Sequence, residues 1–443
     1  MMHPSSKSKL SLIGSVSLGT GVMIGAGIFA LMGQVAELAG SLFPVAFLAG
    51  GIITGLSAYS YVKFSNAYPS SGGVAKFLRK AYGPGTATGS FSLLMYVSMV
   101  IAESLVARTF GSYTLRLFDV DDGGAFVPVL GVVLIAAAFI INVSGNKIIG
   151  ATATITAIAK ILGIALLAIA LLAASGFPSF ETLGSSETSD WSMTGGFVAA
   201  LALSILAYKG FTTITNQGGD IVNPNKNVGR SIIISVLICM VIYVALALSV
   251  SANLSIPEII KAKNYALAEA SQPVFGNLGL WFTVILAIIA TVSGLIASVF
   301  SASRLLAMLS NMKQIPYLQF KFSNPALLFT VSLATILTIL FDLTRIAAIG
   351  AIFYIVMDIA VHWGLFKFLR KEVSYKPIFP LLALLFDAVI LSAFILLKFK
   401  SDPLILIVSF GGILIVVIAE RLFMKTHTDK DGKMHMEMDM KDS

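Results

Sequence analysis

Seven ionisable residues stand inside long apolar runs of the sequence, where each one is energetically expensive. A charged side chain at the centre of a membrane helix costs about 2.5 to 3.5 kcal/mol on insertion scales, so such residues are candidates for function by default. The chemistry that they offer is proton binding and ion pairing. They are Glu103, Arg108, Lys160, Lys209, Asp358, His362 and Asp387.

Lys160 is the main candidate for proton coupling. The apolar run around it, Ala157 to Gly163, carries no acidic residue at helical spacing. Removal from water disfavours the charged ammonium form, so such a lysine can release its proton near neutral pH. The alternative is a structural lysine that stays charged and binds backbone carbonyls.

The other ionisable residues favour pairing. Lys209 either lines a cavity, where it meets an acidic substrate side chain, or pairs with an acid such as Glu103 or Asp358. We favour pairing or a solvated orientation of its side chain. Glu103 and Arg108 are about one helical turn apart, which predicts an ion pair near the outer mouth. Asp358 and His362 share one helical face at i, i+4 spacing and are predicted to form a hydrogen-bonded pair in the core.

Backbone groups are a second source of chemistry, because the first apolar segment, Leu10 to Gly33, is interrupted by glycines. Each interior glycine costs on the order of 1 kcal/mol relative to alanine, so several together predict that the helix opens. In a bilayer an open backbone is tolerated only where protein or a watery cavity surrounds it. The alternative is a close packing face, since Gly21 and Gly25 form a small-xxx-small pair.

A second interruption, Ala207 to Thr213, lies in the sixth apolar span. Spans one and six begin corresponding five-helix blocks, and paired interruptions at matching positions indicate a transporter site at the membrane midplane. This correspondence favours a binding point over packing alone. A dinucleotide-binding loop is excluded because no strand precedes the glycines.

Such a site can bind a zwitterion with backbone groups alone. The N-terminus of a half-helix offers free N–H groups and the positive end of the dipole, which suit a carboxylate. Carbonyls that the opened helices leave free suit an ammonium group. The predicted substrate-binding residues are Met23, Gly25, Ala26, Gly27, Ile28, Leu206, Ala207 and Lys209, with the amides of Ala26, Gly27 and Ile28 facing the carboxylate.

Composition sets the class of protein. Of 443 residues, 57% are hydrophobic and only 12% are charged, about half the charged fraction of a soluble protein. The net charge of +8 arises from Lys and Arg in segments that alternate to one side, which is the positive-inside pattern, so no nucleic-acid partner is expected. The single cysteine, Cys239, excludes a disulfide framework.

No enzyme is expected, since HExxH, Gly-x-Ser-x-Gly and Walker motifs are missing from the sequence. No cofactor or metal is expected either, and a metal site at His427 and His435 of the polar tail is disfavoured. We predict an all-α polytopic membrane protein with about twelve transmembrane helices of about 20 residues each. The first apolar run is too long for a cleavable signal. Both termini are predicted to be cytoplasmic, in a multi-pass protein of the cell membrane.

Four segments together resemble the amino acid-polyamine-organocation superfamily of secondary transporters. They are Gly21–Phe29, Pro69–Gly73, Ala207–Phe211 and Asn223–Val228. The resemblance implies the leucine-transporter-like fold with two inverted five-helix repeats, alternating access, and an amino acid held between helices one and six. The predicted division is a cytoplasmic tail (1–9), a first repeat (10–174), a second repeat (194–370), two extra helices (376–424) and a disordered cytoplasmic tail (425–443).

Within that family, Lys160 matches the position of a lysine in helix five of proton-coupled archaeal members with broad specificity. The resemblance implies that its ammonium stands in for the sodium ion that related transporters bind between helices one and eight. Thr291, Ser293 and Ser298 are then the candidate hydroxyl partners. Two positions depart from the family pattern: Gly219-Asp220 replaces paired acids after helix six, and Lys209 occupies a usually apolar position.

The function that these observations predict is import of amino acids by proton symport. The expected partners are a small amino acid substrate and membrane lipid, with a monomer or weak oligomer as the assembly. An amino acid exchanger that needs no ion gradient is the first alternative. A membrane sensor without transport is the second, and a channel is disfavoured because the sequence has no repeated pore signature.

Overall fold

The computed structural model describes residues 9–118, 120, 124–144, 146–176, 178, 191–315 and 324–427. This part of the chain is helical and contains two isolated β-bridges but no β-strand. The prediction of an all-α polytopic membrane protein is therefore confirmed. His435 and nearly all of the predicted tails lie outside the described residues.

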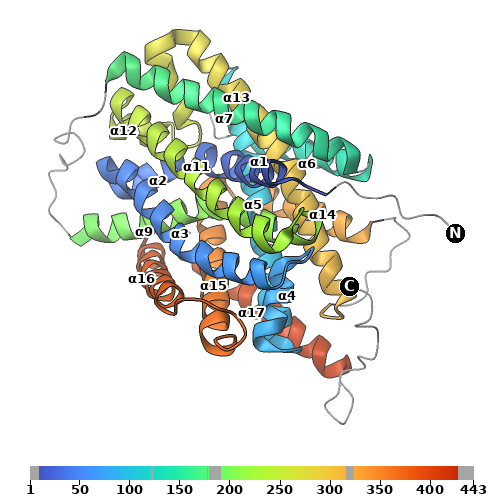
Figure 1. Ribbon diagram of the computed structural model, residues 1–443. Coiled ribbons are helices and arrows are strands. Elements are labelled where there is room, and N and C mark those ends of the chain that lie inside the picture. Colours follow the sequence, from blue (N-terminus) through green and yellow to red (C-terminus); the bar gives the residue numbers. More distant parts are fainter. Residues whose placement is uncertain are drawn as a thin grey trace.

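The described helices follow one another in a single bundle (Figure 1). Their bounds are α1 Leu12–Met23, α2 Phe29–Ala39, α3 Phe43–Ala67, α4 Gly73–Tyr82, α5 Thr86–Arg116, α6 Phe126–Ser144, α7 Asn146–Ser175, α9 Trp191–Tyr208, α10 Thr212–Thr215, α11 Pro224–Asn253, α12 Ile256–Lys261, α13 Ala266–Asn311, α14 Pro325–Leu340, α15 Leu343–Phe368, α16 Ile378–Ser401 and α17 Pro403–His427.

Ten helical stretches of the described chain are long and apolar enough to cross a membrane, and α1 and α14 are shorter apolar helices. The number of crossings and the inverted symmetry of the two blocks stay predictions. The predicted block limits at 174, 194 and 370 lie near helix ends: α7 ends at Ser175, α9 begins at Trp191 and α15 ends at Phe368.

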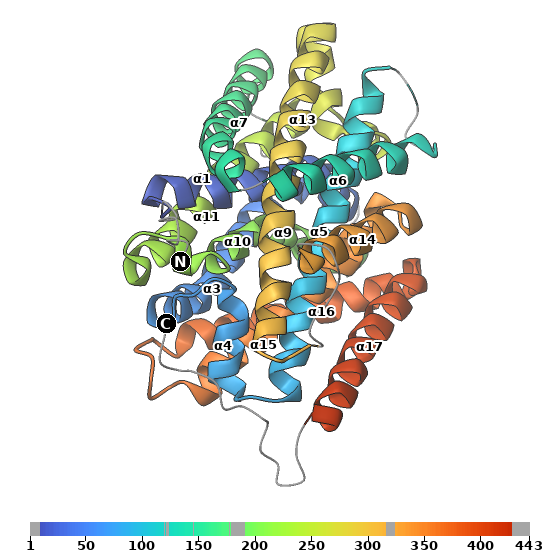
Figure 2. The same ribbon diagram turned by 90° about the vertical axis from the view of Figure 1, so that its right-hand side faces the viewer.

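Burial separates an inner group of helices from an outer one. Most of the apolar span of α5 (78%) and of α15 (83%) is buried, whereas only 22% of the span of α17 is. The large exposed side chains of α17 between Leu404 and Ile418 are apolar, as expected for a surface that faces lipid. Figure 2 shows α17, in red, at the edge of the bundle and α13 running along α5.

Two local features shape α12 and α13. The backbone N–H of Ser255 donates to Glu258 Oε2 at 2.8 Å, which caps the start of α12 as the sequence Ser255-Ile256-Pro257-Glu258 predicts. In α13, Gly276 has φ 56° and ψ −145°, a conformation that favours glycine, so the chain kinks there. The predicted eighth span, from Leu280, begins just after this kink.

Both predicted interruptions exist, but they do not open the backbone. A π-helical segment, η1 (Ile24–Ile28), joins α1 to α2, and the backbone stays right-handed helical from Met23 to Phe29. In the sixth span a 3₁₀ turn, η3 (Lys209–Phe211), joins α9 to α10. The prediction of separated half-helices is thus corrected to one widened and one tightened turn, a type of irregularity that is frequent at functional sites.

Candidate functional site

Lys160 lies on α7 and is buried, with 1% of its surface exposed. Its ammonium donates to the backbone carbonyl of Gly21 at 3.0 Å and to the hydroxyl of Ser293 at 2.8 Å. One side chain therefore ties three helices together: α7, α1 just before η1, and α13. Both ligands are neutral oxygens, so the ammonium, where present, is held by hydrogen bonds rather than by a carboxylate.

Of the three predicted hydroxyl partners, the structure brings only Ser293 to Lys160. The hydroxyl of Thr291 donates to the carbonyl of Ala287 at 2.7 Å, within its own helix. The hydroxyl of Ser298 donates to Glu103 Oε1 at 3.4 Å. The second oxygen of Glu103 has no hydrogen-bond partner among the described residues, and the predicted ion pair with Arg108 is not formed.

Glycines bring helices one and six into direct backbone contact. A Cβ atom added at Gly27 would lie 2.4 Å from the carbonyl oxygen of Ala207, and one added at Gly210 would lie 2.6 Å from the backbone nitrogen of Met23. Gly25 lies equally close to α13, because its added Cβ would be 2.6 Å from the Ala290 oxygen. In this structure these glycines allow helices to pack closely. Close packing is the alternative to an opened helix that the sequence analysis gave for Gly21 and Gly25.

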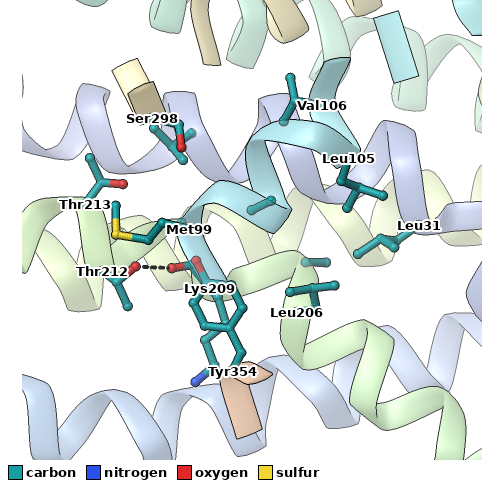
Figure 3. Close-up of a pocket in the computed structure, with 14 residues that line it drawn as sticks. Leu31, Met99, Leu105, Val106, Leu206, Lys209, Thr212, Thr213, Ser298 and Tyr354 are labelled. Carbon is teal, nitrogen blue, oxygen red and sulfur yellow. Dashed lines mark hydrogen bonds between the residues drawn. The ribbon is translucent and has the colours of Figure 1, made fainter. Parts of the chain in front are cut away.

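Two carbonyls predicted to bind an ammonium accept hydroxyl groups instead. The hydroxyl of Tyr243 donates to Ala207 at 3.3 Å, and that of Thr212 donates to Lys209 at 2.9 Å (Figure 3). Both carbonyls are therefore occupied by neutral hydroxyl donors in this structure.

A buried cavity lies beside this contact between helices one and six. Its volume is about 30 Å³, enough for one or two water molecules. Figure 3 shows the side chains that converge on it from five parts of the bundle. They are Val22 and Leu31 of helix one, Met99, Ala102, Leu105 and Val106 of α5, Leu206, Ala207, Lys209, Gly210, Thr212 and Thr213 of helix six, Ser298 of α13 and Tyr354 of α15.

The cavity includes three predicted substrate-binding residues, Leu206, Ala207 and Lys209. Met23, Gly25, Gly27 and Ile28 are buried next to it without lining it, and the side chain of Ala26 lies outside the described part of the chain. The α5 residues and Tyr354 were missed by sequence reasoning. Their apolar types resemble any buried helix face, so no pattern in the sequence distinguishes them.

Lys209 forms an ion pair with Asp358 of α15, and both side chains are buried. Asp358 also accepts the hydroxyls of Ser57 and Tyr61, each at 2.8 Å. Of the two favoured predictions for Lys209, pairing with an acid is confirmed for Asp358. The solvated orientation is wrong, because only 1% of the Lys209 side chain is exposed. His362 does not bind Asp358 as predicted, because its Nδ1 lies 2.9 Å from the Ser60 hydroxyl instead.

Ion pairs lie near both ends of α13. At its C-terminal end, Arg304 pairs with Asp220, which follows helix six. Beside its N-terminal end, Lys263 Nζ lies 2.9 Å from Glu37 Oε1 at the end of α2. The pair of Lys263 and Glu37 bridges the two predicted five-helix blocks, whereas Arg304 and Asp220 both belong to the second block.

Comparison with known proteins identifies this arrangement. Residues 10–419 match the amino acid permease family. The chain is 27% identical to the inner membrane transport protein YbaT of Escherichia coli, with 95% of this chain and 97% of that protein covered. It is 25% identical to the serine/threonine exchanger SteT of Bacillus subtilis, with 92% and 95% covered.

An uncharacterized protein of Methanocaldococcus jannaschii is 34% identical over 80% of this chain and 81% of its own length. The structure and these matches define a multi-pass membrane transport protein rather than an enzyme. The chain belongs to the amino acid permease family, within the amino acid-polyamine-organocation superfamily.

Proposed function

We propose that the chain imports amino acids together with protons, by alternating access at the contact between helices one and six. The observation that carries this proposal is the position of Lys160. It is the group that joins α7 to both α1 and α13, and its partner Gly21 lies in the turn before the π-helical segment.

A proton on Lys160 strengthens this connection. Hydrogen bonds from an ionised donor are roughly twice as strong as those between neutral groups. Loss of the proton therefore weakens the tie between Lys160 and Gly21 and allows helix one to move relative to α13. In the proposed cycle, protonation outside favours the substrate-binding state, and deprotonation on the cytoplasmic side favours release of the cargo.

The proposed substrate is an amino acid. Membership of the family supports this class. The irregular turns at Ile24–Ile28 and Lys209–Phe211 are the places where a shift of helices one and six would expose backbone groups that suit a zwitterion. The cavity of about 30 Å³ is too small for an amino acid, so binding requires helices one and six to separate. Such a separation frees the carbonyl of Ala207 from Tyr243.

Uptake of radiolabelled amino acids into proteoliposomes with an imposed pH gradient, acidic outside, tests the proposal. The wild type accumulates substrate above the outside concentration, and Lys160→Ala does not. Thr291→Val is the matched control, because Thr291 lies on α13 near Ser293 but donates within its own helix. Gradient-driven accumulation by Lys160→Ala at the wild-type level contradicts the proposed role.

Exchange without an ion gradient is the second candidate, because one relative is named a serine/threonine exchanger. The alternative interpretation of Lys160, a structural lysine that stays charged throughout the cycle, fits that mechanism. Counterflow distinguishes the two: exchange that is equal at all pH values, with no net uptake driven by the gradient, favours the exchanger.

A further inference from the structure

A second group of buried ionisable residues lies between α15 and α16, apart from Lys160 and its partners. Asp358 and His362 come from α15 and Asp387 from α16, and one polar atom of each lies within 4.8 Å of the other two. All three side chains are fully buried. Nothing in the proposed coupling through Lys160 uses them.

The carboxylate of Asp358 already has hydrogen-bond donors and a cationic partner. Its carboxylate accepts hydroxyls from Ser57 and Tyr61 of α3 and pairs with the ammonium of Lys209. The charges of Lys209 and Asp358 cancel, which is the arrangement that a buried pair requires. A further cation bound here would lie beside the ammonium and be repelled by it, which argues against a metal ion.

The carboxylate of Asp387, by contrast, lacks hydrogen-bond donors among the described residues. Neither of its carboxylate oxygens has a hydrogen-bond partner among the described residues, and Nε2 of His362 has none either. These unpartnered atoms face each other, since Nε2 lies 3.4 Å from Oδ2 of Asp387. The Ser60 hydroxyl can donate to Nδ1 or accept from it, so this contact does not fix the tautomer of His362. With the hydrogen on Nδ1, Nε2 and the carboxylate are two acceptors in contact and need a hydrogen between them. With the hydrogen on Nε2, the ring donates to Asp387, but the buried carboxylate keeps its charge unless a further proton binds.

The charge count of the group leads to the same requirement. Lys209 supplies one positive charge, while ionised Asp358 and Asp387 supply two negative charges, so one negative charge is uncompensated in the bundle interior. The titratable or charged groups that face the pair are Tyr61 of α3, Lys209 of helix six and Asp358 of α15. Among these, only Lys209 is a cation. One proton shared by His362 and Asp387 restores neutrality.

We propose that His362 and Asp387 form a proton-binding site that is separate from Lys160 and is linked to helix six through Asp358 and Lys209. The proton is exchangeable and lies between Nε2 and the carboxylate. When it leaves, two carboxylates compete for the ammonium of Lys209, which also lines the cavity. The protonation of this site then changes the position of helix six at the proposed substrate site, a consequence that rests on the proposed function.

Infrared difference spectroscopy of the purified protein in liposomes, titrated with pH, tests the site without a transport assay. We expect wild type to show a carboxylic-acid carbonyl band that shifts in D₂O and disappears as the pH rises. Asp387→Asn removes this component, and His362→Gln, which keeps a polar side chain, shifts the pH at which it disappears. Glu103→Gln is the control, because Glu103 is a buried carboxyl group on α5 away from the pair.

A pH-dependent carbonyl component that is the same in Asp387→Asn and wild type overturns the proposal. So does a stoichiometric metal in the purified wild type that Asp387→Asn lacks, measured by elemental analysis. The D₂O shift is measured on the wild type and stays informative if a variant fails to fold. Lys160→Ala keeps the band, so failure of the proposed coupling and failure of this site are distinguishable.

Discussion

The ammonium of Lys160 lies 3.0 Å from the carbonyl oxygen of Gly21, at the last turn of α1 before the chain enters η1. This single contact joins the helix that carries the buried lysine to the helix whose backbone is irregular. Because Ser293 completes the set of ligands at 2.8 Å, a change in the charge of Lys160 acts on α1 and α13 together.

Removal of the Ser293 hydroxyl tests this connection from the side of α13. Ser293→Ala takes away one acceptor of the ammonium, and hydrogen bonds to charged groups contribute about 1.5 to 3 kcal/mol. We expect gradient-driven accumulation to fall about tenfold or more. Thr291→Val leaves the ligands of Lys160 intact and is expected to retain wild-type accumulation, so an equal loss in both variants argues for a general packing defect.

The contact between Gly27 and Ala207 predicts a steric effect. In Gly27→Ala the new Cβ would meet the Ala207 oxygen at 2.4 Å and the Tyr243 hydroxyl at 2.6 Å, and overpacking of this kind costs about 1 to 3 kcal/mol. A lower melting temperature in detergent and reduced uptake are expected. Gly55→Ala is the control, since its Cβ would meet no atom within 4 Å. If Gly27→Ala is as stable as the wild type, the backbone of Gly27 does not lie as close to Ala207 as the structure shows.

The pair of Lys209 and Asp358 predicts non-additive stability effects. Lys209→Met leaves Asp358 buried and uncompensated, and breaking a buried pair from one side costs about 3 to 5 kcal/mol. Asp358→Leu instead leaves the ammonium of Lys209 buried and uncompensated. The double variant removes both charges, so its melting temperature should lie well above that of either single variant. Additive losses would show that the two charges do not interact.

The pair of Arg304 and Asp220 predicts a functional effect with little effect on stability. Both side chains are partly exposed, by 24% and 30%, and exposed pairs contribute about 0 to 1 kcal/mol. Asp220→Arg should impair uptake because it repels Arg304 at this end of the bundle. Adding Arg304→Asp restores the attraction and should restore uptake. A reversed pair as inactive as the single variant would show that uptake does not depend on this contact.

The sequence predicted the features that depend on nearby residues. Apolar runs of about 20 residues locate the helices because burial in hydrocarbon requires that length. The start of α12 at Ser255 is predictable because Pro257 and the acid Glu258 are typical of the first turn of a helix, and Glu258 accepts the backbone N–H of Ser255. Lys160 was recognisable because no acid stands near it at helical spacing, although Ser293 could be named only through the family resemblance.

Features that depend on distant packing were not predicted. Whether the glycines of helix one open the backbone or widen it is decided by Ala207 and Ala290, which come from other helices. The contact of His362 with Asp387 depends on how α15 and α16 are rotated toward each other, and no local pattern encodes that rotation. The cavity residues of α5, such as Met99 and Val106, are apolar like the rest of their helix.

The central claim is that a proton on Lys160 moves with the substrate. The most direct test is the internal pH of proteoliposomes that contain a trapped pH-sensitive dye, followed after an amino acid is added outside without a preset gradient. We predict that the wild type acidifies the lumen in proportion to substrate entry, while Lys160→Ala still exchanges labelled substrate but moves no protons. Acidification by Lys160→Ala at the wild-type ratio of protons to substrate would contradict the account.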